Sequence, residues 1–217
     1  MMSGFLDTEL VSNLVGETKD MDNIHIAYSN ILQFRNENEE WKISQFNNGR
    51  SALYAAAKSF GINMEQHSFI VVKNDGGKVV DKSGNIIASA SISHTKEYSF
   101  AIIMNKKYSI GLDVEKSNRY VGNEVLRYIT KDEHKGHIQD GLLTYWIKKE
   151  AISKATGFGL NVAKDILREE GSEWSFNEER YQAVHWEEEI QGNRFSIAFA
   201  KNKINDSILI SDAIISV

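Results

Sequence analysis

Two acidic residues at alternate positions of an apolar run have the most distinctive chemistry in this sequence. Residues 110–115 read IGLDVE. Side chains alternate between the two sides of a strand, so Asp113 and Glu115 would point to one side and the three apolar side chains into a core. Two carboxylates this close repel each other, and proton sharing, a basic neighbour or a hard cation relieves the repulsion. On these residues alone a solvated sheet face is the simpler interpretation, and a cation site is the alternative.

A third acid occurs in residues 146–154, which read WIKKEAISK. On a helix, Trp146, Glu150 and Lys154 are four residues apart and share one stripe, with Lys149 beside it. An aromatic ring, a carboxylate and an ammonium on one stripe suit a functional site. The alternative is a surface Glu–Lys pair, worth about 0.3–0.5 kcal/mol, beside a core tryptophan.

Two further segments have side chains that could bind phosphate. Residues 91–95, SISHT, are expected at a strand end, where the hydroxyl of Ser93 and the imidazole of His94 could donate hydrogen bonds. Residues 47–52, NNGRSA, place Arg50 at the expected start of a helix, where free backbone amides and a guanidinium suit an anion. The alternatives are a solvated histidine and an ordinary surface arginine.

The elements that must position these residues follow from local pattern. Strong helix formers predict a helix over residues 51–60, ended by Gly61. Runs rich in strand formers then indicate an antiparallel sheet. These runs are residues 69–72, 86–92, 98–104 and 108–114.

The second half of the chain repeats the order of a helix followed by strands. A capping-box spacing at residues 130–133 and a helix over 140–156, ended by Gly157, precede a hairpin of residues 181–187 and 194–200. Residues 208–215 would add an edge strand. We therefore expect an α+β fold of two similar lobes, residues 1–105 and 106–217, related by a pseudo-twofold axis. Each lobe would be a helix packed on a small antiparallel sheet, with the active site in the cleft between them.

Composition limits the classes of function. The 217 residues carry a formal charge of −5 without long blocks of one sign, which argues against nucleic-acid binding. No cysteine is present, so disulfides and thiolate chemistry are excluded. The first residues do not read as a signal peptide, and no apolar run approaches the roughly 20 residues of a membrane span, so we expect a cytoplasmic protein without membrane contact.

In their order and spacing, the four segments together resemble the 4′-phosphopantetheinyl transferase superfamily. Its pattern is a Gly-Arg pair, then Ser-x-Ser-His, Gly-x-Asp-x-Glu and Trp/Phe-x-x-Lys-Glu-(Ala/Ser)-x-x-Lys. The resemblance covers about residues 47–159, and the last two motifs are its specific part. The chain length is similar to that of the longer, pseudo-dimeric type, which activates peptide and polyketide synthetases.

The resemblance implies transfer of phosphopantetheine from coenzyme A to a serine of an apo acyl or peptidyl carrier protein by a monomeric enzyme. Adenosine 3′,5′-bisphosphate would be released. Asp113, Glu115 and Glu150 would hold Mg²⁺, the hard ion that such carboxylates suit. The serine proton has two candidate acceptors, Glu150 and a water on the metal.

The other matching positions would contact coenzyme A. Lys154 would neutralise the leaving bisphosphate, with help from Lys149. His94, with Ser93, would bind the pyrophosphate, and Arg50 would bind the 3′-phosphate. Gly-Lys-Val at residues 77–79 departs from the Gly-Lys-Pro of many relatives, so Lys78 is not counted among these ligands.

Two other classes of protein remain open. A non-catalytic relative would bind coenzyme A or a carrier without transfer, but it has no need of three metal-binding acids. A metal-dependent nucleotide phosphohydrolase would use the acids but not the Ser-His segment.

Overall fold

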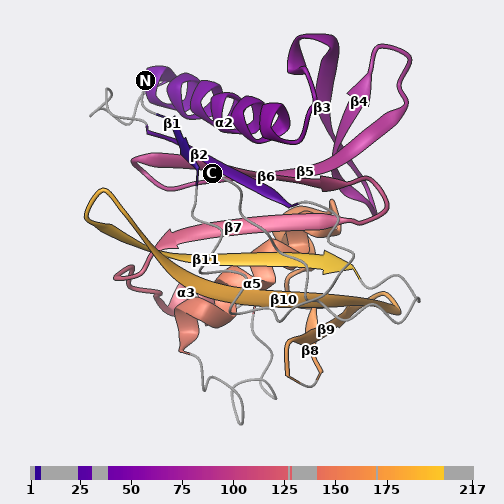
Figure 1. Cartoon of the computed structure of the whole chain (residues 1–217). Helices are drawn as coiled ribbons and strands as arrows, with labels where there is room; N and C mark the ends of the chain where they lie inside the picture. The colour runs from indigo at the N-terminus through magenta and orange to yellow at the C-terminus, as the bar shows by residue number, and fades with distance from the viewer. Residues whose placement is uncertain are drawn as a thin grey trace. The chain divides into compact units, whose positions relative to one another are not determined.

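The computed structural model describes residues 3–5, 24–30, 39–126, 128, 141–169 and 171–202. These residues form two compact units, one containing residues 3–5, 24–30, 39–70 and 78–108, and the other containing residues 71–77, 109–126, 128, 141–169 and 171–202. Each unit is an antiparallel sheet packed against one long helix (Figure 1), which confirms the predicted α+β class with two similar lobes. The predicted boundary after residue 105 and the pseudo-twofold axis stay predictions.

The first sheet has six strands in the order β1-β2-β6-β5-β4-β3. Its strands are β1 (Ser3–Phe5), β2 (His25–Asn30), β3 (His67–Val72), β4 (Gly76–Asp81), β5 (Ile86–His94) and β6 (Tyr98–Asn105). A short 3₁₀ helix, η1 (Met64–Gln66), precedes β3. The strand runs predicted from the sequence did not include β1, β2 or β4.

The helix of the first unit, α2 (Glu39–Ser59), is longer than expected because it begins twelve residues before Ser51. Its end matches the sequence signal. Gly61 has φ +87°, and its amide donates to Lys58 O while the amide of Ile62 donates to Ala57 O. This pair of hydrogen bonds satisfies the last free carbonyls of a helix closed by a left-handed glycine.

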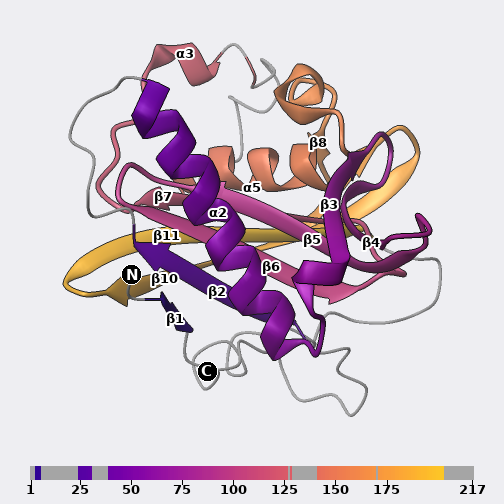
Figure 2. The same ribbon diagram turned by 90° about the horizontal axis from the view of Figure 1, so that it is seen from above.

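Small residues let α2 lie close to its sheet (Figure 2). Ala52 and Ala56 of the helix are buried with Ala90 of β5 and Ala101 of β6. A Cβ on Gly49 would lie 3.1 Å from Ile92 Cγ2, so this glycine also favours close packing. Packing therefore holds the weak helix formers around Gly49 in helical conformation, against their low intrinsic propensity.

The second sheet has five strands in the order β7-β11-β10-β9-β8. Its strands are β7 (Ile110–Lys116), β8 (Leu167–Arg168), β9 (Glu173–Phe176), β10 (Glu179–Ile190) and β11 (Asn193–Asn202). The predicted hairpin is confirmed as β10 and β11, joined by Gln191 and Gly192, both with positive φ. The grouping of residues 108–114 with the earlier strands was wrong, because β7 pairs with β11.

The helix α5 (Leu142–Ala155) packs on β7, β11 and β10 of this second sheet. Two short helices, α3 (Asn123–Leu126) and η3 (Gly159–Val162), complete the unit. The predicted capping box at residues 130–133 and the strand over 208–215 lie outside the described residues. In the described part of the chain, no helix has both the length and the apolar character of a membrane span.

Candidate functional site

Strand β7 places Asp113 and Glu115 on the side of its sheet that faces α5. In the register with β11, Asp113 lies opposite Ala198 and Glu115 opposite Ser196. Ala198 belongs to the buried cluster around α5, which identifies this side of the sheet. Because both partners on β11 are small, the two carboxylates have room beside them, and the strand alternation predicted from the sequence is confirmed.

The backbone of Gly111 lets α5 approach β7 closely. A Cβ at this position would overlap the carbonyl oxygen of Ala151 and lie 2.7 Å from the backbone nitrogen of Ala155. Any side chain here would push the helix outward. Since Glu150 immediately precedes Ala151, the glycine sets how near Glu150 comes to the acids of the strand.

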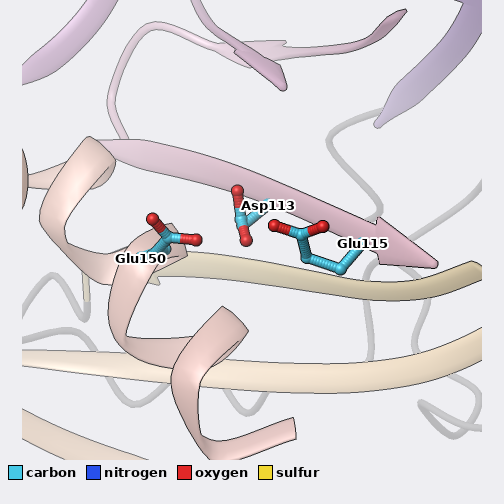
Figure 3. A group of neighbouring side chains, drawn as sticks. All are labelled: Asp113, Glu115 and Glu150. Atoms are coloured by element: carbon cyan, nitrogen blue, oxygen red, sulfur yellow. The ribbon is translucent and has the colours of Figure 1, made fainter. Parts of the chain in front are cut away.

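The three acids converge on one point in Figure 3. Asp113, Glu115 and Glu150 each offer a carboxylate oxygen, and these oxygens lie within 4.8 Å of one another. Carboxylate oxygens at this spacing are the donor set of a hard divalent cation such as Mg²⁺. The structure thus brings together all three residues that the sequence pointed to as metal ligands.

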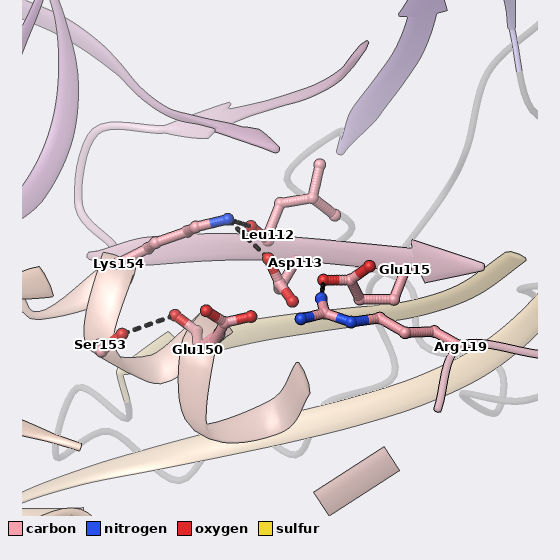
Figure 4. A network of polar contacts seen from close by, with 7 residues as sticks. All are labelled: Leu112, Asp113, Glu115, Arg119, Glu150, Ser153 and Lys154. Carbon is pink, nitrogen blue, oxygen red and sulfur yellow. Dashed lines mark hydrogen bonds and ion pairs between the residues drawn. The ribbon is translucent and has the colours of Figure 1, made fainter. Parts of the chain in front are cut away.

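Each of the two carboxylates on β7 also pairs with a basic side chain (Figure 4). Lys154 Nζ lies 2.7 Å from Asp113 Oδ1 and donates a second hydrogen bond, of 2.9 Å, to Leu112 O. The guanidinium of Arg119 forms an ion pair with Glu115. Lys154 is therefore at the predicted site, and Arg119 is an addition that sequence reasoning missed.

Crowding changes the acidity of Glu150. Burial raises the pKa of Glu150 to about 8, and the negative charge and hydrogen bond of Asp113 add to the effect, against the opposing charges of Lys154 and Arg119. At neutral pH, Glu150 thus mostly keeps its proton and shares it with Asp113. A divalent cation relieves the same repulsion, so the residues present fit a metal ion.

Lys149 lies elsewhere in the second unit. Its side chain is fully buried, and its ammonium donates hydrogen bonds to Tyr128 O at 3.1 Å and Ala163 O at 3.0 Å. The ammonium nitrogen also lies 5.6 Å from the centre of the Tyr145 ring. A buried ammonium cannot contact a ligand in this arrangement, so the predicted coenzyme A contact of Lys149 is corrected to a structural role.

Trp146, predicted on the same stripe as Glu150, is a core residue. It is 4% exposed and its ring lies 5.2 Å from that of Tyr128. The alternative interpretation of this tryptophan was therefore right. Only Glu150 and Lys154 of the stripe face the acids of β7.

Arg50 and His94 line one pocket of the first unit, with a volume of about 440 Å³. The guanidinium of Arg50 lies between the rings of Phe46 and Tyr54, 5.7 and 5.8 Å from their centres, and donates to Tyr54 Oη at 3.2 Å. Because Arg50 is inside α2, the predicted help from free amides at a helix start is wrong. An arginine and a histidine beside apolar walls still suit an anionic ligand.

Ser93 does not join Arg50 and His94. Along β5, Ile92 faces α2, so Ser93 points to the opposite side of its sheet, where it is 3% exposed. Lys78 is also fully buried, and its ammonium donates to Ser89 Oγ at 2.8 Å and Tyr108 O at 3.0 Å. Its exclusion from the expected ligands agrees with this placement.

Two residues of the site had signals that could have found them. Gly111 stands two positions before Asp113, where a glycine inside a strand marks a close backbone approach. Arg119 is four residues after Glu115 and just past the strand end, where a turn can fold it back.

No protein-family model matches this chain, and a search of curated proteins finds no match. The function of this chain must therefore be inferred from the residues of the site and their geometry.

Proposed function

We propose that this protein transfers the 4′-phosphopantetheine group of coenzyme A to a serine hydroxyl of an apo acyl or peptidyl carrier protein. One observation carries the proposal: Asp113 and Glu115 from a strand meet Glu150 from a distant helix, with Lys154 on Asp113. These residues occur in the order and spacing of the transferase motifs. The carrier supplies the nucleophile, so this chain needs no nucleophile of its own.

Asp113, Glu115 and Glu150 would hold Mg²⁺, which supplies charge neutralisation and polarisation of phosphate oxygens when bound. In the reaction, the serine oxygen forms a bond to the phosphorus that carries pantetheine, and the bond from this phosphorus to adenosine 3′,5′-bisphosphate breaks. Lys154, held beside the acids by Leu112 O, neutralises the charge on the leaving bisphosphate.

The serine proton needs an acceptor near the cluster. Glu150 has a pKa of about 8 in the metal-free protein, because it is buried beside Asp113. Once a cation displaces the proton of Glu150, its free carboxylate would be one candidate acceptor, and a water on the metal would be the other. Arg50 and His94 contact phosphate groups of coenzyme A in this proposal, a part that depends on the motif resemblance and on the pocket they share.

The same three acids also suit a metal-dependent phosphohydrolase acting on nucleotides. That enzyme would split coenzyme A with no carrier present. The transferase proposal predicts that coenzyme A stays intact until an apo carrier is added.

Intact-mass analysis tests both functions. A panel of apo acyl and peptidyl carriers is incubated with the protein, Mg²⁺ and coenzyme A, and at least one carrier should gain the mass of a phosphopantetheine group. Asp113→Asn should abolish the gain, while Asp165→Asn, an exposed acid of the same unit, should leave it unchanged. No gain on any carrier would refute the transferase, and bisphosphate release without a carrier would favour the hydrolase.

A further inference from the structure

A tight turn at the end of β7 folds Arg119 back over the acid cluster. The amide of Arg119 donates to Lys116 O at 2.9 Å, and the amide of Ser117 donates to Arg194 O at 3.0 Å. Ser196 Oγ also donates to Ser117 Oγ at 3.1 Å. Backbone and side-chain bonds to β11 thus build this turn, so the position of Arg119 is set by the fold and not by a mobile side chain alone.

The guanidinium reaches Glu115 from the solvent side of the cluster. The side chain of Arg119 is 43% exposed, against 17% for Glu115. Figure 4 shows it on the side of Asp113 away from Lys154, pointing toward the acids. The positive charge of Arg119 also acts to lower the pKa of Glu150. Arg119 therefore offsets negative charge on the whole acid cluster and is more than a surface ion pair with Glu115.

This ion pair uses a carboxylate that a metal ion would need. A divalent cation on Glu115 competes with the guanidinium for the same oxygens, and the two positive charges repel each other. Once displaced, an exposed guanidinium at the rim of a cation site faces whatever anion the cation binds. Its planar fork of donors matches phosphate oxygens.

We propose that Arg119 is a further ligand-binding residue of this site, which pairs with Glu115 in the metal-free protein and contacts a phosphate oxygen of the anionic substrate when a divalent cation takes Glu115. The inference deepens the proposed function and rests on it for the identity of the substrate. Lys154 and Arg119 then flank the bound phosphate from opposite sides of Asp113.

Two binding measurements with opposite signs test the proposal without any transfer reaction. Mn²⁺ alone is titrated calorimetrically into the wild type and Arg119→Gln, and the variant should bind it about three- to tenfold more tightly, because a competing charge is gone. Inorganic pyrophosphate is then titrated into each Mn²⁺-saturated protein. Here the variant should bind about tenfold more weakly, because a charge-assisted hydrogen bond is lost.

Two further variants make the result specific. Arg119→Lys keeps the charge but loses the fork, so Mn²⁺ affinity should return to the wild-type value while pyrophosphate affinity recovers only in part. Arg180→Gln replaces an exposed arginine of β10 in the same unit, away from this turn, and should change neither affinity. Thermal unfolding of each variant confirms that it folds.

Unchanged affinities for both probes in Arg119→Gln would overturn the proposal, since Arg119 would then be a surface ion pair without function. Weaker binding of both probes would also overturn it, because that pattern means a structural role. The expected pattern would stand even if no carrier were modified, so failure of the transferase proposal and failure of this inference are distinguishable.

Discussion

Gly111 of β7 lies directly against the carbonyl of Ala151 of α5, with no space between them for a side chain. This contact brings strand and helix together at the point where their acidic residues meet. The carboxylates of the strand and of the helix depend on it for their spacing, which metal binding requires. The contact thus links the packing of the second unit to the chemistry of its site.

Gly111→Ala should therefore disturb the site as well as the fold. The added methyl group must push α5 away from β7, which we expect to cost about 1–3 kcal/mol of unfolding free energy, as overpacking typically does. It should also weaken Mn²⁺ binding at least tenfold, because Glu150 moves away from Asp113. Denaturant unfolding and calorimetric titration measure the two effects.

A control separates destabilisation from displacement of the acids. Gly171 has φ +60° with open space around it, so Gly171→Ala should cost about 1 kcal/mol through backbone strain. Its Mn²⁺ affinity should equal that of the wild type. Equal affinities in both glycine variants would contradict the positioning role of Gly111.

The stability of the metal-free protein should fall as the pH rises through 8. The pKa of Glu150 is raised from 4.5 to about 8, so between these values the folded protein binds a proton that the unfolded chain has lost. The contribution of this proton to the free energy of unfolding is complete below pH 4.5 and disappears above pH 8. From pH 6 to pH 9 this group alone should remove about 2–3 kcal/mol. Urea unfolding in chelator measures it, and Glu150→Gln should lack this component.

Metal binding should release a proton below pH 8. A cation on Glu150 must displace the proton that the raised pKa holds there, so Mn²⁺ affinity should rise by up to about tenfold per pH unit between pH 6 and 7.5. Calorimetry in buffers of different ionisation enthalpy counts the released protons. Affinity independent of pH would mean that Glu150 does not bind the ion.

Lys149→Met should destabilise the protein without a direct effect on coenzyme A. The substitution keeps the buried length but leaves the carbonyls of Tyr128 and Ala163 without the ammonium, which we expect to cost about 1–3 kcal/mol. Lys164→Met, at an exposed position of the same unit, should change stability by less than about 0.5 kcal/mol. A large loss of coenzyme A affinity in a stable Lys149→Met protein would restore its predicted role as a ligand.

Arg50→Gln should weaken binding of coenzyme A by about tenfold with little change in stability. Arg50 is exposed on α2 and lines the same pocket as His94, so its charge is available to an anion. Lys58→Gln, on the same helix but outside that pocket, is the matched control. Fluorescence or calorimetric titration compares them, and equal affinities would remove Arg50 from the binding site.

The sequence by itself determined the features that depend on neighbours along the chain. Strand alternation put Asp113 and Glu115 on one side of β7, and helical spacing put Glu150 and Lys154 on one stripe of α5. Turn chemistry likewise predicted the end of α2 at Gly61. These are short-range effects, because backbone geometry fixes side-chain direction within a few residues.

Only the tertiary structure decided which elements meet. It paired β7 with β11 and extended α2 back to Glu39, which left Arg50 inside the helix. It also turned Lys149 into the core although its neighbour Glu150 faces the site. These outcomes depend on packing between segments far apart in the chain, which local pattern does not encode; at Gly111, the absence of a single side chain lets α5 and β7 bring the acids together.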